Sequence, residues 1–301
     1  MTEPVAAAPS APISPSMISP SLTDAYAQAA ERVRALDKDR WLAGLFVPAE
    51  ARPHVYALYA FSAEIARVRD VVSDPLPGEV RLQWWRDLIE GSAHGEANAN
   101  PLAAALLDTV ERFALPRAAL IRLIDARIFD LYDDPMPTVN DLEGYAGDTA
   151  SALLQLAAIV LAGGKDPGTA EVAGHAGVAY ALTGLLRTFP FHAARGQVFL
   201  PEDLLARHGV ARADILSGRS TPGLAAALAE AADLARDHLE RTRALIGRVG
   251  PAIRPAFLPV ALVEPFLRAL ARPARDPFRE IVDLPQWRKQ WVLWRAARQA
   301  G

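Results

Sequence analysis

Arginine side chains are the residues of this sequence best suited to binding a phosphate group. Arg67, Arg187 and Arg195 carry guanidinium groups, which bind phosphate through paired hydrogen bonds and need no metal ion. The alternative is that these arginines pair with acids such as Asp70 or cap the ends of helices, which is their commoner use. We favour the alternative, and the residues alone leave both interpretations open.

One cluster of acids has a spacing that would suit a metal ion. Asp130, Asp133 and Asp134 stand at i, i+3 and i+4, which places their side chains on one face of a helix end. Such clusters usually face water. We therefore interpret these three residues as solvated acids that precede the turn at Pro135.

A second group of charges predicts an ion-pair network. Asp70 and Asp74 lie about one helical turn apart, and Arg67 and Arg69 are near enough in sequence to pair with them. Opposite charges at this spacing on a surface form salt bridges more often than metal sites. We expect these acids to be paired with the adjacent arginines.

Three tryptophans near the end of the chain form a stripe on one predicted helix. Trp287, Trp291 and Trp294 stand at i, i+4 and i+7, and Arg288 and Arg295 project about a quarter-turn away. Our preferred interpretation is that this helix docks on the core through its aromatic face. The alternative is that the stripe meets a membrane surface or a protein partner.

Composition excludes several classes of function. The 301 residues include no cysteine, which excludes disulfides and thiolate metal sites. The net charge of −3 predicts no general attraction to nucleic acid or to anionic lipid. No stretch of about 18 residues is uniformly apolar, so we expect no membrane span. The excess of arginine over lysine and the abundance of alanine are typical of a bacterium with a GC-rich genome. The six histidines are scattered and never have the spacing of zinc ligands.

Alanine and leucine dominate the sequence, which favours helix, and no long alternation of apolar and polar residues predicts a sheet. Residues 1–20 are rich in proline, alanine and serine and are expected to be a disordered leader. Residues 21–301 are expected to form a single all-α domain. Its predicted helices cover about 23–36, 49–72, 78–91, 101–114, 117–132, 139–163, 168–189, 221–247, 252–271 and 286–299.

The end of the predicted helix 168–189 combines close-packing residues with a helix breaker. Gly174, Gly177 and Gly184 would let another backbone approach closely or leave room for a ligand. Pro190 ends or kinks this helix, because it removes a backbone donor and clashes with the preceding turn. The loop expected to follow carries His192, Arg195 and Gly196.

Four segments, in order and at consistent spacing, resemble the squalene/phytoene synthase family. Residues 57–70 resemble its first signature, in which Tyr-Ala-Phe-Cys/Ser precedes Arg-x-x-Asp-Asp-x-x-Asp. Residues 180–201 resemble its second, an Asn-Ile-Leu-Arg-Asp-x-x-Glu-Asp stretch followed by Gly-Arg-x-Tyr-Leu-Pro. Residues 81–87 and 145–154 resemble its Arg-Leu-x-x-Trp-Arg segment and its small-residue cavity helix.

The resemblance implies an isoprenoid synthase-like helical bundle around a central cavity. In that family, two acidic clusters face each other across the cavity and bind magnesium, which in turn binds the diphosphates of two prenyl substrates. Carboxylate oxygens suit this task because they hold hard cations, and the cations neutralise the departing diphosphate.

The acidic positions of both signatures differ in this chain. The residues that stand at those positions are Ala66, Arg67, Thr188, Phe191 and His192. Asp70 and Arg187 keep their places in the two signatures. The resemblance therefore implies no catalytic residue, no metal ligand and no cofactor, with magnesium expected only if the protein is an enzyme. The residues expected to line the altered cavity and to contact a substrate or phosphate are Arg67, Asp70, Tyr145, Arg187, His192 and Arg195.

Three functions agree with these observations. The departures resemble the branch that contains the mitochondrial assembly factor of respiratory complex I, which implies a non-catalytic protein with complex I subunits as partners. The alternative is a magnesium-dependent, head-to-head prenyltransferase of isoprenoid biosynthesis. A third is a binding protein for an isoprenoid or a quinone-like lipid. The protein is expected in the cytoplasm, or peripherally at the inner face of the cytoplasmic membrane.

Overall fold

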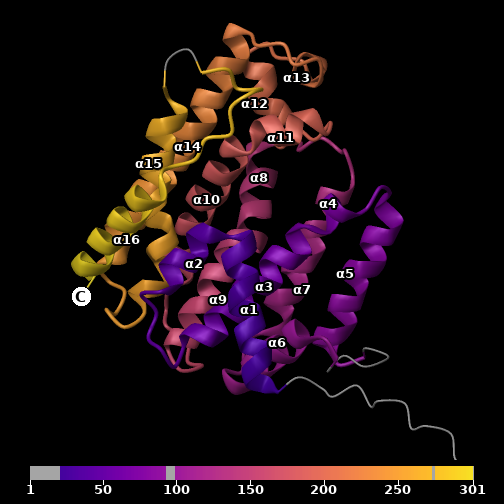
Figure 1. Ribbon diagram of the computed structural model, residues 1–301. Helices are drawn as coiled ribbons and strands as arrows, with labels where there is room; N and C mark the ends of the chain where they lie inside the picture. The colour runs from indigo at the N-terminus through magenta and orange to yellow at the C-terminus, as the bar shows by residue number, and fades with distance from the viewer. Residues whose placement is uncertain (1–20, 93–98, 273–274, 301) are drawn as a thin grey trace, which may run out of the picture.

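Helices form all the regular structure in the part of the chain that the computed structural model describes, residues 21–92, 99–272 and 275–300 (Figure 1). The predicted all-α fold is confirmed. The leader expected over 1–20 lies outside the described residues, and the single domain expected over 21–301 stays a prediction. The α-helices are α1 Leu22–Leu36, α2 Lys38–Gly44, α3 Arg52–Ala66, α4 Val68–Val71, α5 Pro75–Glu90, α6 Pro101–Arg112, α7 Arg117–Ile128, α8 Val139–Ala146, α9 Ala152–Leu161, α10 Ala170–Arg187, α11 Phe189–Ala194, α12 Glu202–Arg207, α13 Arg212–Leu216, α14 Pro222–Ile246, α15 Val263–Leu270 and α16 Gln286–Ala300.

Several predicted helices are divided into shorter elements. The helix expected over 139–163 contains a π-helical turn, η3 (Gly147–Ser151), between α8 and α9. The helix expected over 252–271 begins as a 3-10 helix, η4 (Arg254–Leu262), because Pro259 within it cannot donate an α-helical hydrogen bond. A third short element, η2 (Phe129–Leu131), follows α7. The short helices α2, α12 and α13 were not predicted, because five to seven residues are too few to show a helical period.

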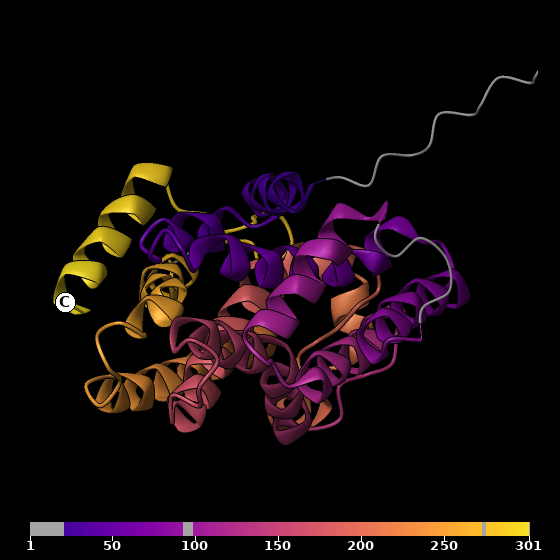
Figure 2. The same ribbon diagram turned by 90° about the horizontal axis from the view of Figure 1, so that it is seen from below.

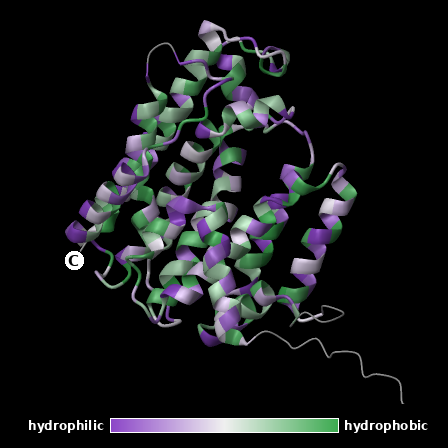
Figure 3. Cartoon of the chain, viewed as in Figure 1, coloured by the Kyte–Doolittle hydropathy of each residue, from purple (hydrophilic) through white to green (hydrophobic). Residues whose placement is uncertain are grey.

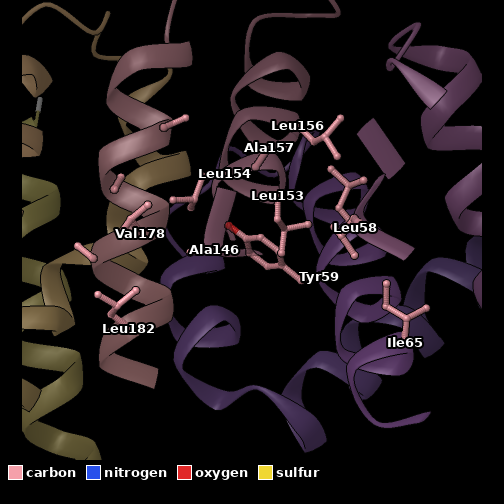
Figure 4. Packing of buried hydrophobic residues seen from close by; sticks show 14 of the residues in the cluster. Leu58, Tyr59, Ile65, Ala146, Leu153, Leu154, Leu156, Ala157, Val178 and Leu182 are labelled. Carbon is pink, nitrogen blue, oxygen red and sulfur yellow. The ribbon is translucent and has the colours of Figure 1, made fainter. Parts of the chain in front are cut away.

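The central helices α3, α9 and α10 build the main hydrophobic core. Figure 4 shows Leu58 and Tyr59 of α3 beside Leu153 of α9, with Val178 of α10 on the facing helix. Among the described residues, one helical run, Val139–Leu161, is long and apolar enough to cross a membrane, and 56% of its apolar window is buried inside the bundle. Its apolar character is therefore accounted for by its place in the core.

One glycine of α10 is required by the close approach of the π-helical turn. A Cβ atom at Gly177 would lie 2.2 Å from the Ser151 hydroxyl oxygen and 2.3 Å from the Ser151 backbone nitrogen. Ser151 also donates a hydrogen bond of 2.9 Å to the carbonyl oxygen of Gly174. The prediction of close backbone packing is thus confirmed at Gly177, while a Cβ at Gly184 would meet nothing within 4 Å.

A second, smaller apolar cluster lies where α16 packs along the edge of the bundle. Leu293 of α16 is fully buried against η4 and α15, with Leu258 and Phe266 in the same cluster. Figures 1 and 2 both place α16 at the outer edge, beside α15 and η4 and near α2. The C-terminal helix is therefore a covering element of the bundle and not part of its centre.

We predict that Gly177→Ala destabilises the protein by about 1–3 kcal/mol, because the new methyl group has no space against Ser151. Gly184→Ala is the matched control, since it adds the same methyl group to open space and raises helix propensity by up to about 1 kcal/mol. Urea unfolding followed by circular dichroism measures both changes. Equal stability of the two variants would contradict the proposed close contact.

Candidate functional site

The two signature stretches meet at one end of the bundle. Asp70 lies in α4, the short helix that comes after α3, and Arg195 directly follows the last residue of α11. The Arg195 guanidinium donates a hydrogen bond to the Asp70 carboxylate. The same guanidinium lies 4.2 Å from the centre of the Phe191 ring. The predicted pairing of Asp70 with neighbouring arginines is wrong, because the chain reversal after α10 brings Arg195 to it.

The predicted loop after Pro190 is instead the short helix α11 (Phe189–Ala194). Pro190 stands in its first turn, where the missing N–H has no helical partner to lose. α10 ends at Arg187, as predicted from Pro190. Within α11, the Thr188 hydroxyl oxygen lies 3.0 Å from His192 Nε2, so the imidazole is held toward the bundle.

A buried polar cluster lies beside these residues. Arg127 Nη1 donates to Asp130 Oδ2 at 2.9 Å and to the Tyr145 hydroxyl oxygen at 2.6 Å. The Tyr145 hydroxyl donates to Asp130 Oδ1 at 2.8 Å. Gln197 Nε2 donates to the backbone carbonyl oxygen of Asp130 at 2.8 Å. The interpretation of Asp130 as a solvated acid is wrong, because η2 turns the side chain inward, where it is 8% exposed.

Charges inside this cluster stabilise one another. Burial alone lowers the pKa of Arg127, but the neighbouring Tyr145 and Asp130 outweigh burial and raise it. Burial raises the pKa of Tyr145 well above its ordinary value, with Arg127 opposing and Asp130 adding to the effect. The cluster therefore holds a charged arginine and a neutral tyrosine near neutral pH.

His192 lines an apolar pocket near this cluster. Its ring stacks edge-on against Phe199, with centroids 4.8 Å apart, and its Nδ1 atom is buried without a hydrogen-bond partner. Burial lowers the pKa of His192, and the negative charge of Asp130 only partly offsets that effect. The imidazole is therefore neutral at pH 7.

The pocket beside His192 is apolar and narrow. Its volume of about 20 Å³ is room for about one water molecule. Most of its lining comes from leucine and phenylalanine side chains of α10, the adjoining α11 and the segment that follows. The bundle therefore encloses an apolar pocket, and of the six residues expected at the cavity only His192 lines it. That pocket must widen before it can hold a prenyl chain, since ligand pockets usually exceed about 300 Å³.

Arg187 points away from this pocket, toward the C-terminal helix. Its Nη1 lies 3.1 Å from Asp39 Oδ2 and its Nη2 lies 3.3 Å from Asp283 Oδ1. Its Nε donates to the carbonyl oxygen of Val282 at 3.1 Å, and its guanidinium carbon lies 3.5 Å from the centre of the Phe266 ring. The alternative prediction, that this arginine pairs with acids, is therefore confirmed.

The structure thus brings together four of the six residues expected at the cavity. Asp70, Tyr145, His192 and Arg195 lie at one end of the bundle. Arg187 belongs to a different cluster, and Arg67 is an exposed residue between α3 and α4 without an ion pair to any described residue. Whether any of the six binds a phosphate or substrate stays a prediction.

Sequence reasoning did not identify Arg127, Gln197 or Phe199 as part of this site. The i, i+3 spacing of Arg127 and Asp130 was the signal available, because it places a base and an acid side by side at a helix end.

The acids at this end of the bundle do not suit a magnesium ion. Asp70 is paired with Arg195 and Asp130 with Arg127, so each carboxylate already has a cationic partner. Asp133, from the same predicted acidic cluster, lies 3.5 Å from Arg69. Over the described ranges, no group of three or more acids or histidines is placed to hold a metal ion.

Comparisons with known proteins agree with these features. The sequence model of the squalene/phytoene synthase family matches residues 33–295. The chain is 32% identical to "NADH dehydrogenase (ubiquinone) complex I, assembly factor 6" of Rattus norvegicus, over 90% of this chain and 85% of that protein. It is 25% identical to 15-cis-phytoene synthase of Synechococcus elongatus, over 92% and 94% of the two chains. A solved dehydrosqualene synthase in complex with ligand superimposes with a TM-score of 0.77 at 18% identity, over 92% and 97% of the two chains, which confirms the predicted fold.

We predict that the buried, neutral His192 makes the protein less stable in acid. The folded-state pKa lies below the unfolded value of about 6.5, so this contribution is complete above pH 6.5 and is lost as the pH falls through the folded pKa. His192→Gln should reduce the acid dependence of the free energy of unfolding, by up to about 1.4 kcal/mol per pH unit. Urea unfolding at a series of pH values measures it.

Thr188→Val is the control for this experiment, because it removes the hydrogen bond at Nε2 but keeps the imidazole. It should keep the acid dependence of the unaltered protein. An unchanged pH profile in His192→Gln would show that other groups cause the loss of stability.

Proposed function

The chain belongs to the squalene/phytoene synthase family, and we propose that it is a non-catalytic member that acts in the assembly of respiratory complex I. The observation that carries this proposal is its similarity to complex I assembly factor 6 over 90% of its length. We propose complex I subunits as its partners. We place it in a bacterial cytoplasm, at the inner face of the cytoplasmic membrane.

The chemistry at the end of the bundle supports a non-catalytic role. A synthase of this family needs unpaired carboxylates to hold the cations that neutralise a leaving diphosphate. Here two acids at this end of the bundle, Asp70 and Asp130, are each paired with an arginine. Ala66 and Thr188, at positions where the family resemblance expects acids, have no oxygen anion to contribute.

The narrow pocket supports the same conclusion. About 20 Å³ of space beside His192 does not hold a prenyl chain, and two such chains must lie side by side in a condensation. The apolar lining would suit an isoprenoid or quinone-like tail if α11 moved outward. Lipid binding is therefore the second candidate function, and it requires an opening of the pocket.

We predict that deletion of the gene in its source organism lowers the amount of assembled complex I. Membranes of the deletion strain should show reduced inhibitor-sensitive NADH:quinone reductase activity and a weaker complex I band on native gels. Succinate dehydrogenase activity is the control and should not change. A plasmid copy of the unaltered gene should restore complex I.

The purified protein tests the rival enzyme directly. Farnesyl or geranylgeranyl diphosphate, with magnesium or manganese, should give no condensed product above the level of boiled protein. Normal complex I in the deletion strain, together with a condensed product in this assay, would replace our proposal with the prenyltransferase alternative.

A further inference from the structure

The tryptophan stripe of α16 faces solvent, which corrects the preferred interpretation of the sequence. Trp287, Trp291 and Trp294 are 69%, 54% and 40% exposed. The helix docks instead through its other side, where Leu293 is fully buried and Lys289 is 6% exposed. α16 therefore has two apolar faces, and the core covers only one of them.

The exposed rings form one continuous surface. Trp291 and Trp294 are stacked, with ring centroids 5.0 Å apart and planes 22° from parallel. The guanidinium of Arg298 lies 4.9 Å from the centre of the Trp294 ring. Contiguous exposed aromatic surface is uncommon on a soluble protein and marks an interaction site. Over the described residues, no segment of this chain covers the three rings.

A basic groove adjoins this surface. It has a volume of about 640 Å³ and runs between α14, η4, α15 and α16. Phe257, Ala261 and Val292 contribute to an apolar floor, and Arg288 and Arg295 of α16 lie along one side. Its one acid, Glu264, is already neutralised by Arg268 at 2.7 Å. The groove therefore combines apolar surface with positive charge.

The charge of α16 contrasts with that of the whole chain. The helix contains Arg288, Lys289, Arg295 and Arg298 and no acidic residue, whereas the 301 residues together carry −3. Figure 3 shows strongly hydrophilic residues along this helix, and Figure 2 shows it at the outer edge, where a flat surface can reach it. Lys289 is buried and paired, so the charge at the surface comes from the exposed Arg295 and Arg298 and the half-buried Arg288.

We propose that the outer face of α16 and the adjoining groove form a docking surface for a bilayer that contains anionic phospholipid. Tryptophan rings favour the interfacial region of a bilayer, where the ring is buried among lipid and the indole N–H stays in a polar layer. The arginines lie beside them, where they meet lipid phosphates. Charge complementarity selects the anionic bilayer over a neutral one. This inference does not depend on the role in complex I assembly.

The experiment measures flotation of the full-length protein with vesicles of two compositions. It should bind vesicles of phosphatidylcholine mixed with phosphatidylglycerol, and bind vesicles of phosphatidylcholine alone much more weakly. A triple variant, Arg288→Gln with Arg295→Gln and Arg298→Gln, should lose affinity for the anionic vesicles by roughly fivefold for each arginine. Added salt should weaken binding in the same direction.

A second triple variant, Trp287→Ser with Trp291→Ser and Trp294→Ser, should abolish binding. In the unaltered protein, tryptophan emission should shift to the blue and brominated phospholipid should quench it, and both effects should disappear in this variant. The matched control is Leu76→Ser with Val80→Ser, which removes equally exposed apolar residues from α5, on the other side of the bundle, and should bind normally. Unchanged thermal unfolding of each variant verifies that it is folded.

Three results would overturn the proposal. They are absence of binding to anionic vesicles, equal binding to neutral and anionic vesicles, and equal loss of binding in the α5 control. The first result would indicate a surface suited to a protein partner, and the second would indicate a surface that meets a bilayer through its apolar rings without the arginines.

Discussion

A cluster of four charges, in which Asp39 and Lys289 are buried, Arg187 is half-buried and Asp283 is exposed, connects the C-terminal helix to the rest of the bundle. Lys289 Nζ lies 2.6 Å from Asp283 Oδ1. It also lies 2.8 Å from Asp39 Oδ1, with which it forms an ion pair but no hydrogen bond. Arg187 contacts the same two acids. Burial alone would raise the pKa of Asp283, but its contacts with Lys289, the Leu284 amide and Arg187 lower it overall. Removal of either cation leaves the two acids with one cationic partner in place of two, and loss of its charged hydrogen bonds costs about 1.5–3 kcal/mol.

This cluster decides which face of α16 is exposed. Because Lys289 must reach Asp39 on α2, the helix turns Leu293 inward and the tryptophans outward. The same cluster occupies Arg187, the arginine next to Thr188, where the family resemblance expects an aspartate. One arrangement thus accounts for two features, an arginine directed away from the pocket and a terminal helix that presents an aromatic surface. The chain has the fold of the synthases, and the charged residues of this cluster hold α16 against the rest of the bundle.

Apolar periodicity predicted the helices of the fold well, but the partners and the burial of polar side chains were predicted less well. The long helices and the end of α10 near Pro190 could be predicted from local pattern, because apolar spacing and the backbone chemistry of proline act within a few residues. The alternative that Arg195 pairs with Asp70 is confirmed, but spacing could not choose Arg195 over the arginines adjacent to Asp70. Spacing also did not show the burial of Asp130, which depends on contacts between distant segments. The tryptophan stripe was placed on the correct helix but on the wrong side. A helix with two apolar faces has no periodicity that tells which face is covered.

The central claim is that Arg187 holds the C-terminal helix and does not bind a diphosphate, and amide hydrogen exchange of α16 tests it most directly. In Arg187→Gln, the α16 amides should exchange roughly tenfold faster, as expected for a loss of about 1.5 kcal/mol. The exposed Arg67→Gln control should leave them unchanged, and pyrophosphate with magnesium should not alter exchange near residue 187 in the unaltered protein. Unchanged α16 exchange in Arg187→Gln, together with pyrophosphate protection that this variant loses, would contradict the claim.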